Sequence, residues 1–430
     1  SEMCIRDSFW GGVQPEYGYD DLCANFNEEY KDKGLQVEYV RYVNDDNGNL
    51  QLETYLMGGG DVDLFIGYGG RTKMDKRVDS NLLLDMSGML NDIGFNLDDE
   101  LGVANMAEYH YDDGAVYGFP TKYENSRWIL INEDMFKEAG LDIPYDGWTY
   151  SEFLADAEKL THGEGQDKVY GVCWARKQSG KSILYALDGV LGANQIYKNE
   201  EGTEVNFDND VYRAGLNLVK ETLDKGYAIP IEDEFSEDIS VANTFLQGKC
   251  AIMLGVAQMR LCMDQENYPH DFMTALVPAP VPDDEKYNTE FYRKQIGTTG
   301  AGDLLSISAN TKYPEASFEF AMWYLKGGMS PLVQGGRIPL WNGVNKDEVL
   351  SVLKEKAQGS IDMDSMENYL SLDTTQGVAA IKGNASSEIS SAWFEEFDAM
   401  CYGKQSVDQT VQNMEKRGNE LIQTELSSQK

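Results

Sequence analysis

The sequence predicts an α/β fold class arranged as two lobes, and three observations lead to this prediction. Segments that read as strands alternate along the chain with segments that read as helices, which is the pattern of α/β architectures. The chain has 430 residues, more than one small hydrophobic core accommodates. Two segments, 117–122 and 296–308, each join an extended stretch to a new α/β block, and we interpret them as crossings between lobes.

The first block of the chain reads as a β-α-β-α-β unit. Its elements are expected in the order strand ending at Phe9-Trp10, helix 20–30, strand 35–43, helix 49–57 and strand 62–66. Three glycines at 58–60 stop the second helix, and no Gly-Lys-Ser/Thr sequence follows them, which argues against a phosphate-binding loop. Because the loops after the strands of such a unit gather at one edge of the sheet, ligand contacts are expected there.

The rest of the chain continues the alternation and then becomes helical. Strands are expected at 128–131, 170–173, 251–254 and 304–308, and helices at 133–139, 153–160, 314–325, 346–358, 386–401 and 406–426. Gly140 suits the C-cap of the first of these helices, and Thr149 or Ser151 suits the N-cap of the second. The order of strands and helices predicts sheets that are largely parallel.

The charge balance excludes two classes of partner. The chain carries 73 acidic and 36 basic residues, which gives a formal net charge of −37. A protein with this negative charge repels phosphate backbones and anionic lipid headgroups. The charge therefore argues against nucleic-acid binding and against a polybasic membrane contact. No apolar run in the sequence approaches the roughly 20 residues of a membrane-spanning helix.

Metal and nucleophile chemistry has little support in the sequence. The chain has three histidines and six cysteines, and their spacing matches no zinc motif. We therefore expect no metal and no cofactor. The cysteines are expected as scattered buried thiols, with disulfides in an export compartment as the alternative.

The first eight residues look foreign to the protein. Residues 2–8, EMCIRDS, resemble one reading frame of a transposase sequencing adapter, and they lack the basic and apolar regions of a secretory signal. We interpret residues 1–8 as a non-native scar that replaced a signal peptide, so Cys4 is expected to have no functional role.

The segment 117–161 carries a series of motifs. They are GFP at 118–120, WILIN at 128–132, MFKEAG at 135–140 and a Pro144…Trp148-Thr149 turn. This series resembles the signature stretch of family 1 extracellular solute-binding proteins, the maltose-binding-protein-like group of ABC transporters.

Further motifs follow in the family's order across nearly the whole chain. They are GDVDLF at 60–65, LLDM at 83–86, FLQGKCAIM at 245–253, LSIS at 305–308, KYPEASF at 312–318, GRIP at 336–339 and GKQSVDQ at 403–409. Two positions depart from the family pattern. Val62 replaces the usual proline, and GVAQ at 255–258 replaces a Gly-x-Trp motif whose tryptophan often stacks on sugar. The second departure weakens the expectation of a maltose-like ligand.

The resemblance implies a two-lobed periplasmic-binding-protein fold with a hinge, a ligand cleft between the lobes and a helical C-terminus. The N-terminal lobe is then expected to comprise 9–121 and 300–338, and the C-terminal lobe 122–299 and 339–430. The implied function is that of a non-enzymatic receptor of a bacterial ABC importer, which binds a carbohydrate, an oligosaccharide by expectation, as a monomer and passes it to the membrane permease subunits. The resemblance also implies an extracellular location, as a membrane-anchored lipoprotein or in a periplasm.

A sugar site combines aromatic platforms with polar side chains that bind hydroxyl groups. The loops expected at the cleft offer both kinds of side chain. The candidates are Trp10, Gln14, Glu16, Tyr68, Gly69, Arg71, Lys122, Tyr123, Glu124, Trp174, Arg176, Gln258, Gly300, Trp341 and Trp393. A place in the core is an equal alternative for Trp10 and Trp393, and Trp128 is expected in the core because its neighbours are aliphatic. A solvated surface charge is an equal alternative for Glu124.

Three other functions stay open at this point. A secreted carbohydrate-active hydrolase would use two carboxylates, although no nucleophile elbow, HExxH or Ser-Lys pattern occurs. The same fold could bind a polyamine or another small solute, against which the basic candidates Arg71, Lys122 and Arg176 argue. A sensor that hands its liganded form to a receptor kinase is the third alternative.

Overall fold

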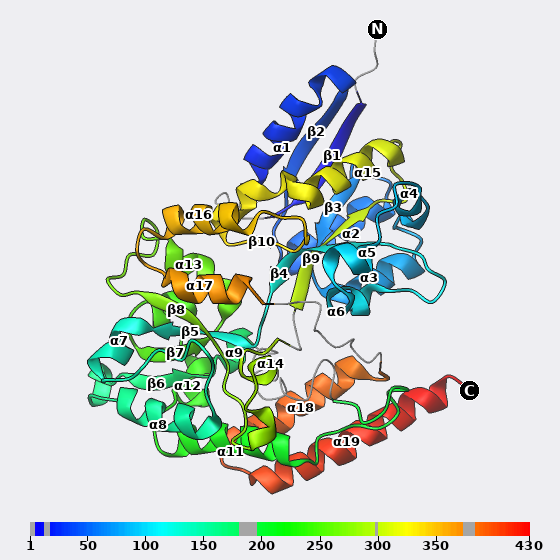
Figure 1. Cartoon of the computed structure of the whole chain (residues 1–430). Coiled ribbons are helices and arrows are strands. Elements are labelled where there is room, and N and C mark those ends of the chain that lie inside the picture. Colours follow the sequence, from blue (N-terminus) through cyan, green and yellow to red (C-terminus); the bar gives the residue numbers. More distant parts are fainter. Residues whose placement is uncertain (1–4, 13–17, 180–195, 297–299, 373–382) are drawn as a thin grey trace. The chain divides into compact units, whose positions relative to one another are not determined.

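The computed structural model describes residues 5–12, 18–179, 196–296, 300–372 and 383–430, and these form two compact units. Unit 1 comprises Ser1–Glu124 and Gly300–Lys356, and unit 2 comprises Asn125–Thr299 and Ala357–Lys430. The chain therefore passes from one unit to the other three times (Figure 1).

Unit 1 is built on a six-stranded sheet with the strand order β10-β4-β9-β3-β1-β2. Its strands are β1 (Ile5–Gly11), β2 (Leu35–Arg41), β3 (Leu64–Gly67), β4 (Phe119–Glu124), β9 (Gly300–Ile307) and β10 (Ile338–Pro339). Its main helices are α1 (Tyr19–Glu29), α2 (Asp46–Met57), α3 (Gly70–Asp79), α4 (Ser87–Asp92), α5 (Leu97–Leu101), α6 (Val103–Met106), α15 (Pro314–Trp323) and α16 (Lys346–Ala357), the last of which runs one residue into unit 2.

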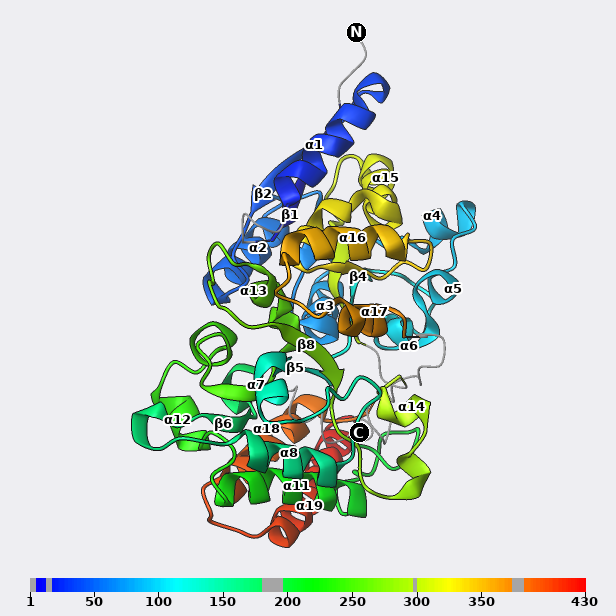
Figure 2. The same ribbon diagram turned by 60° about the vertical axis from the view of Figure 1, so that its left-hand side comes forward.

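Aromatic side chains fill the core between the unit 1 sheet and two of its helices. Helix α1 packs on β2 (Figure 2), and α15 packs on β1 and β9. The ring of Phe9 on β1 lies 5.2 Å from that of Phe320 on α15, and the ring of Phe320 lies 5.0 Å from that of Phe26 on α1. These three rings are at most 1% exposed, so they anchor both helices to the sheet by apolar burial.

Unit 2 is built on a four-stranded sheet with the strand order β6-β7-β5-β8. Its strands are β5 (Trp128–Asn132), β6 (Tyr170–Cys173), β7 (Cys250–Leu254) and β8 (Thr274–Pro278). Its helices include α7 (Glu133–Glu138), α8 (Tyr150–Leu160), α9 (Arg176–Ser179), α11 (Asp210–Asp224), α12 (Ile231–Ser236), α13 (Met259–Met263), α14 (Glu290–Arg293), α17 (Met363–Leu370), α18 (Ser386–Cys401) and α19 (Val407–Ser428).

Local sequence signals fix several of the unit 2 helices. Thr149 is the N-cap of α8, where its hydroxyl accepts a hydrogen bond from the backbone N–H of Glu152. Gly140 follows α7 with a φ of +72°, a conformation that favours glycine. The long helices α18 and α19 pack side by side along the C-terminal part of the chain (Figure 1), which confirms the predicted helical C-terminus.

The expectation of largely parallel sheets is wrong. Among the described strands, β1 pairs in parallel with β2 and β3, and β6 pairs in parallel with β7. The pairs β3–β9, β4–β9, β4–β10, β5–β7 and β5–β8 are antiparallel. Strand β9 does not follow a crossover helix within unit 1, because the chain re-enters that unit at Gly300 after its passage through unit 2. It runs antiparallel to both β3 and β4.

The unit boundaries lie close to the expected lobe boundaries at two of the three passages. Residues 122–124 complete β4, and 339–356 belong to unit 1 instead of the second lobe. The reason is local pairing: Pro339 on β10 pairs with Lys122 on β4, and the backbone N–H of Asn342 donates to the carbonyl of Glu100.

Residues 5–8, which the sequence assigned to a non-native scar, form the first half of β1. Ile5 to Ser8 pair in register with Leu35 to Glu38 on β2. The hydroxyl of Ser317 on α15 donates to the buried carboxyl group of Asp7 at 2.7 Å, and the N–H of Ser8 donates to Asp63 at 2.7 Å. These residues therefore contribute to the packing of unit 1.

Four cysteines, Cys23, Cys173, Cys250 and Cys262, are buried free thiols, which confirms the expectation for these positions. Cys401 is a free thiol that is partly exposed. Within the described ranges, no helix is both long and apolar enough to cross a membrane.

Candidate ligand-binding site

The carboxyl edge of the unit 1 sheet gathers most of the described candidate residues of that unit. Strand β3 ends at Gly67 and is followed by Tyr68, and β4 ends with Lys122, Tyr123 and Glu124. Because β9 and β10 run antiparallel to their neighbours, their first residues lie at this same edge. The edge thus also receives Gly300–Asp303 from β9, with Gly300 paired to Glu124, and Arg337 from the residue before β10.

A network of charged side chains spans three strands at this edge. The guanidinium Nε of Arg337 donates to Oδ2 of Asp303 at 2.8 Å. The ammonium group of Lys122 lies 3.7 Å from Oδ1 of Asp303 and 3.3 Å from Oε2 of Glu124. The side chain of Asp303 is only 6% exposed, whereas those of Lys122 and Glu124 are each 23% exposed. The carboxylate at the centre is therefore shielded from water, and its partners reach the surface.

The pKa values of this network follow from burial and pairing. Burial alone would raise the pKa of Asp303, but Lys122 and Arg337 outweigh it and hold the pKa below its usual value. Burial alone would lower the pKa of Lys122, but Asp303 and Glu124 raise it above its usual value. The Asp303 carboxylate and the Lys122 ammonium group therefore both stay ionised at neutral pH.

Tyr68 follows β3 at this edge and lies within electrostatic range of Asp303 and Arg337. Tyr68 is partly exposed, and its ring lies 5.8 Å from that of buried Tyr42. Burial raises the pKa of Tyr68 well above its usual value, so its hydroxyl stays neutral as a hydrogen-bonding group. Tyr19 and Tyr39 stack with centroids 5.6 Å apart, and the Tyr39 hydroxyl donates to the carbonyl of Gly12 after β1. The edge thus combines an accessible aromatic ring with charged donors and acceptors.

Three other candidates of unit 1, Arg71, Gly69 and Tyr123, have structural roles or are buried. The guanidinium of Arg71 donates to Asp75 at 2.6 Å and to the carbonyls of Glu108 and His110, so it ties α3 to residues 108–110. Gly69 is the N-cap of α3, with a φ of +87°. Tyr123 is 8% exposed, because its side chain alternates with those of Lys122 and Glu124 along β4.

Trp10 lies in the core of unit 1. It is 3% exposed, its ring contacts those of Tyr42 and Tyr55, and its indole N–H donates to the hydroxyl of Ser8 and the carbonyl of Asp61. This placement favours the core alternative that the sequence left open.

Two tryptophans that the sequence proposed as ligand contacts lie in the core of unit 2. Trp174 is 1% exposed, stacks on Phe153 of α8 at 5.5 Å, and donates its indole N–H to the hydroxyl of Thr222 at 2.9 Å. Trp393 is also 1% exposed, and its ring stacks on Phe397 at 4.8 Å. The loop position of Trp174 suggested accessibility, but α8 and α11 cover it, and both rings are core residues in this structure. Trp128 is buried on β5 as expected.

Arg176 and Gln258 lie after neighbouring strands of unit 2. Arg176 follows β6 and forms a two-bond ion pair with Asp398 of α18, at 2.8 and 2.9 Å, while its guanidinium lies 4.2 Å from the centre of the Phe394 ring. Gln258 follows β7 and is partly exposed. Both residues are partly exposed, and the pairing of Arg176 with α18 gives it a structural role.

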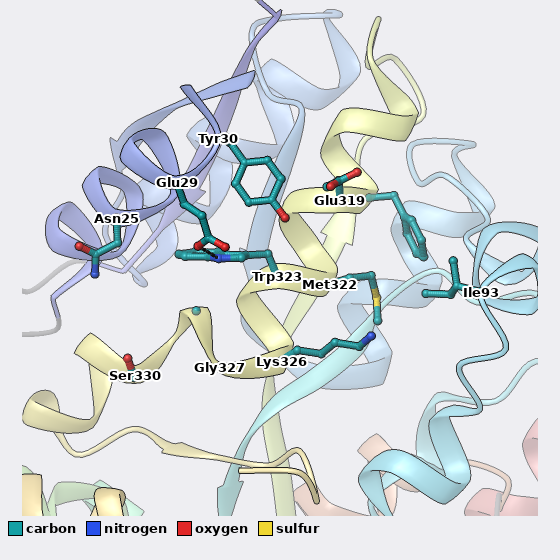
Figure 3. Close-up of a pocket in the computed structure, with 12 residues that line it drawn as sticks. Asn25, Glu29, Tyr30, Ile93, Glu319, Met322, Trp323, Lys326, Gly327 and Ser330 are labelled. Atoms are coloured by element: carbon teal, nitrogen blue, oxygen red, sulfur yellow. Dashed lines mark hydrogen bonds between the residues drawn. The ribbon is translucent and has the colours of Figure 1, made fainter. Parts of the chain in front are cut away.

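Trp341 lines a cavity of unit 1. Its indole N–H donates to Glu100 at 2.8 Å, and the cavity of about 1010 Å³ lies among α1, the 3₁₀ helix Ser330–Gly335 and α16. A neighbouring cavity of about 780 Å³ contains Glu29, Tyr30 and Trp323, with a hydrogen bond from the Trp323 indole to Glu29 (Figure 3). Tyr68, Lys122 and Asp303 line neither cavity.

Asp303 and Arg337 of the charged network were not among the residues that the sequence predicted for the site. Arg337 belongs to the GRIP motif, and an acidic residue directly before the aliphatic LLSIS run was the available signal for Asp303. Gln14 and Glu16 lie outside the described residues. Among the residues that the structure describes, no group of His, Cys, Asp and Glu is arranged to hold a metal ion.

Comparison with known proteins identifies the family. The sequence matches the family model of bacterial extracellular solute-binding proteins over residues 11–326. The chain belongs to this family.

Solved structures with the same fold cover nearly all of this solute-binding protein. A sugar transporter from Rhizobium etli, in an open conformation, is 17% identical with a TM-score of 0.73 over 96% of this chain and 99% of its own. An ABC substrate-binding protein from Listeria monocytogenes, in complex with cycloalternan, is 16% identical with a TM-score of 0.71 over 97% and 99%. The cyclic α-maltosyl-1,6-maltose binding protein from Arthrobacter globiformis is 15% identical with a TM-score of 0.69 over 98% and 99%. These likenesses confirm the predicted fold class.

Proposed function

We propose that this solute-binding protein binds an oligosaccharide for an ABC importer and does not transform it. The observation that carries the proposal is the carboxyl edge of the unit 1 sheet, where the ring of Tyr68 lies near the ionised Lys122–Asp303–Arg337 network. Sugar rings stack on aromatic faces through their C–H groups, and their hydroxyls bind charged donors and acceptors. Two of the similar solved proteins are described with cyclic oligosaccharides, which supports the same ligand class here.

The network argues for binding over hydrolysis at this edge. A glycosidase needs one carboxyl group that stays protonated as a general acid. The pKa of Asp303 is held low by two cations, so its carboxylate is unsuited to that role. A polyamine is disfavoured at this edge because the carboxylates Asp303 and Glu124 are already paired with Lys122 and Arg337, so they attract a cationic ligand less strongly than unpaired carboxylates would. We also propose that the protein passes its ligand to a membrane permease, and that it is located in a periplasm or anchored to the membrane by a lipid.

A thermal-shift screen with oligosaccharides tests the ligand class. A ligand that binds only the folded protein stabilises it and so raises its melting temperature. At a ligand concentration 100 times the Kd, the free energy of unfolding rises by about 2.7 kcal/mol. We expect at least one neutral oligosaccharide to raise the melting temperature and to remain intact after incubation, as mass spectrometry would show. Shortened products would favour the hydrolase alternative, and the sensor alternative predicts that the liganded form binds a receptor kinase instead of a permease.

Removal of the aromatic ring tests the site. Tyr68→Ala should weaken oligosaccharide binding by about 1–2 kcal/mol, or roughly 5- to 30-fold in Kd, since a stacked ring contributes on this scale. Tyr313→Ala is the matched control, because Tyr313 is also in unit 1 and is 37% exposed. Equal affinities of both variants, measured by isothermal titration calorimetry, would place the sugar elsewhere.

A further inference from the structure

The backbone at Asp303 is unusual. Asp303 has a φ of +54° within β9, in the left-handed region that residues with side chains seldom adopt. The pairing of β4 with β9 is interrupted there: Pro120 pairs with Leu304 and Lys122 with Gly302, while the Thr121 hydroxyl donates to the Asp303 carbonyl at 2.9 Å. Such a conformation costs on the order of 1–3 kcal/mol, and a glycine would relieve it. Aspartate is one of the few residues other than glycine that adopt this conformation, and unlike glycine it brings a carboxylate to this position.

The Asp303 carboxylate is shared between two cations that come from different strands. Its two oxygens face Arg337, at 2.8 Å, and Lys122, at 3.7 Å. Arg337 and Lys122 approach from β10 and β4, so one carboxylate sets the orientation of both side chains. Buried ion pairs add little net stability because removing the charges from water is costly. A strained, buried residue that orders two cations at a candidate binding edge therefore points to binding.

Charge balance is the second property of this network. Two cations, Lys122 and Arg337, face two carboxylates, Asp303 and Glu124. A cation with a carboxylate partner already in contact gives a weaker electrostatic reward to an anionic ligand than an unpaired cation would. It retains strong hydrogen-bond donors for neutral hydroxyl groups.

We propose that Asp303 is the positioning residue of this site: it orients Lys122 and Arg337 and neutralises them, so that the site selects uncharged oligosaccharides over uronate-containing ones. This inference rests on the proposed function. It assigns the selectivity to Asp303, which acts on the ligand indirectly, through the side chains of Lys122 and Arg337.

The test is the selectivity of Asp303→Asn. Asparagine tolerates the left-handed backbone and keeps the shape of aspartate, so the substitution removes the negative charge and replaces one of the two acceptor oxygens with an amide NH2 group. Neutral xylo-oligosaccharides and malto-oligosaccharides, and the uronate-bearing glucuronoxylo-oligosaccharides and oligogalacturonides, are titrated by calorimetry. For the wild-type protein, we expect a neutral sugar to bind best. For Asp303→Asn, we expect at least tenfold weaker binding of that sugar and at least tenfold stronger binding of a uronate-bearing one.

Two further variants separate positioning from mere stabilisation. In the double variant Asp303→Asn with Lys122→Gln, one cation and one carboxylate are removed, so the gain in uronate binding should disappear. Glu38→Gln is the control, because it removes one carboxylate of unit 1 from a surface pair with Arg6 and should leave the selectivity unchanged. If Asp303→Asn does not fold, Lys122→Gln carries the test, with a predicted loss of neutral-sugar affinity and a stronger rejection of uronates.

The outcomes distinguish this inference from the proposed function. A wild-type protein that binds no sugar would contradict both. A wild-type protein that binds neutral sugars, combined with a selectivity ratio that Asp303→Asn leaves unchanged while the melting temperature falls, would contradict the positioning role alone. A wild-type preference for uronates would contradict the charge-balance argument.

Discussion

Glu234 predicts an unusual pH dependence of stability in unit 2. Its side chain on α12 is 0% exposed, and burial is the main cause that raises its pKa from 4.5 to about 8. The backbone N–H groups of Arg176 and Lys177 lower the pKa, but they do not compensate for burial. Glu234 is therefore largely protonated in the folded protein at neutral pH and ionised in the unfolded chain.

The sign and size of the effect follow from proton linkage. Between about pH 4.5 and 8 the folded state binds the proton that the unfolded state has lost, so the free energy of unfolding falls as pH rises and levels off above pH 8. Each pKa unit corresponds to about 1.4 kcal/mol, so the shift corresponds to a fall on the order of 5 kcal/mol. Glu234→Gln keeps the shape of the protonated side chain without the titration and should remove about 3–5 kcal/mol of this fall.

Urea unfolding at several pH values between 5 and 9, followed by circular dichroism, measures the effect. Other carboxyl groups with raised pKa values, including Asp7 and Glu133, titrate in both proteins, so the difference between wild type and Glu234→Gln isolates Glu234. Parallel plots of the free energy of unfolding against pH for the two proteins would refute the reasoning.

Two further predictions concern the cores of the units. Trp174→Ala should lower the stability of unit 2 by about 3–5 kcal/mol, because it leaves a cavity and removes the hydrogen bond to Thr222. Sugar affinity, measured at a temperature where the variant is folded, should stay unchanged. A normal melting temperature combined with weaker sugar binding would instead make Trp174 a ligand contact. Deletion of residues 1–8 should lower the melting temperature, because β1 loses its first half and the bond between Ser317 and Asp7, but sugar affinity should stay unchanged; a melting curve identical to that of the full chain would contradict this.

Much of the fold follows from local signals. The strand at 170–173 and the helix at 386–401 were predicted with the bounds that the structure shows, because apolar periodicity and flanking residues define them. The antiparallel direction of β9 was missed, since it depends on the passage of the chain through unit 2 and on nothing within residues 300–307.

The candidate site was predictable only where a residue's place in the sheet decides its exposure. Tyr68 and Lys122 follow or end strands, so their position at the carboxyl edge could be derived. Trp174 also follows a strand, but its burial depends on Phe153 and Thr222, which are distant in sequence. The role of Asp303 could not be predicted, because it depends on contacts with the side chains of Lys122 and Arg337, which are distant in sequence.

Hydrogen exchange with and without the best-binding oligosaccharide tests the central claim most directly. A bound ligand protects the backbone around its site from exchange. We predict slower exchange in the presence of the sugar at the carboxyl edge of the unit 1 sheet, in peptides covering 67–71, 119–124, 300–306 and 336–340. Protection confined to the cavity beside Trp323, or no protection in any of these four segments, would contradict the account.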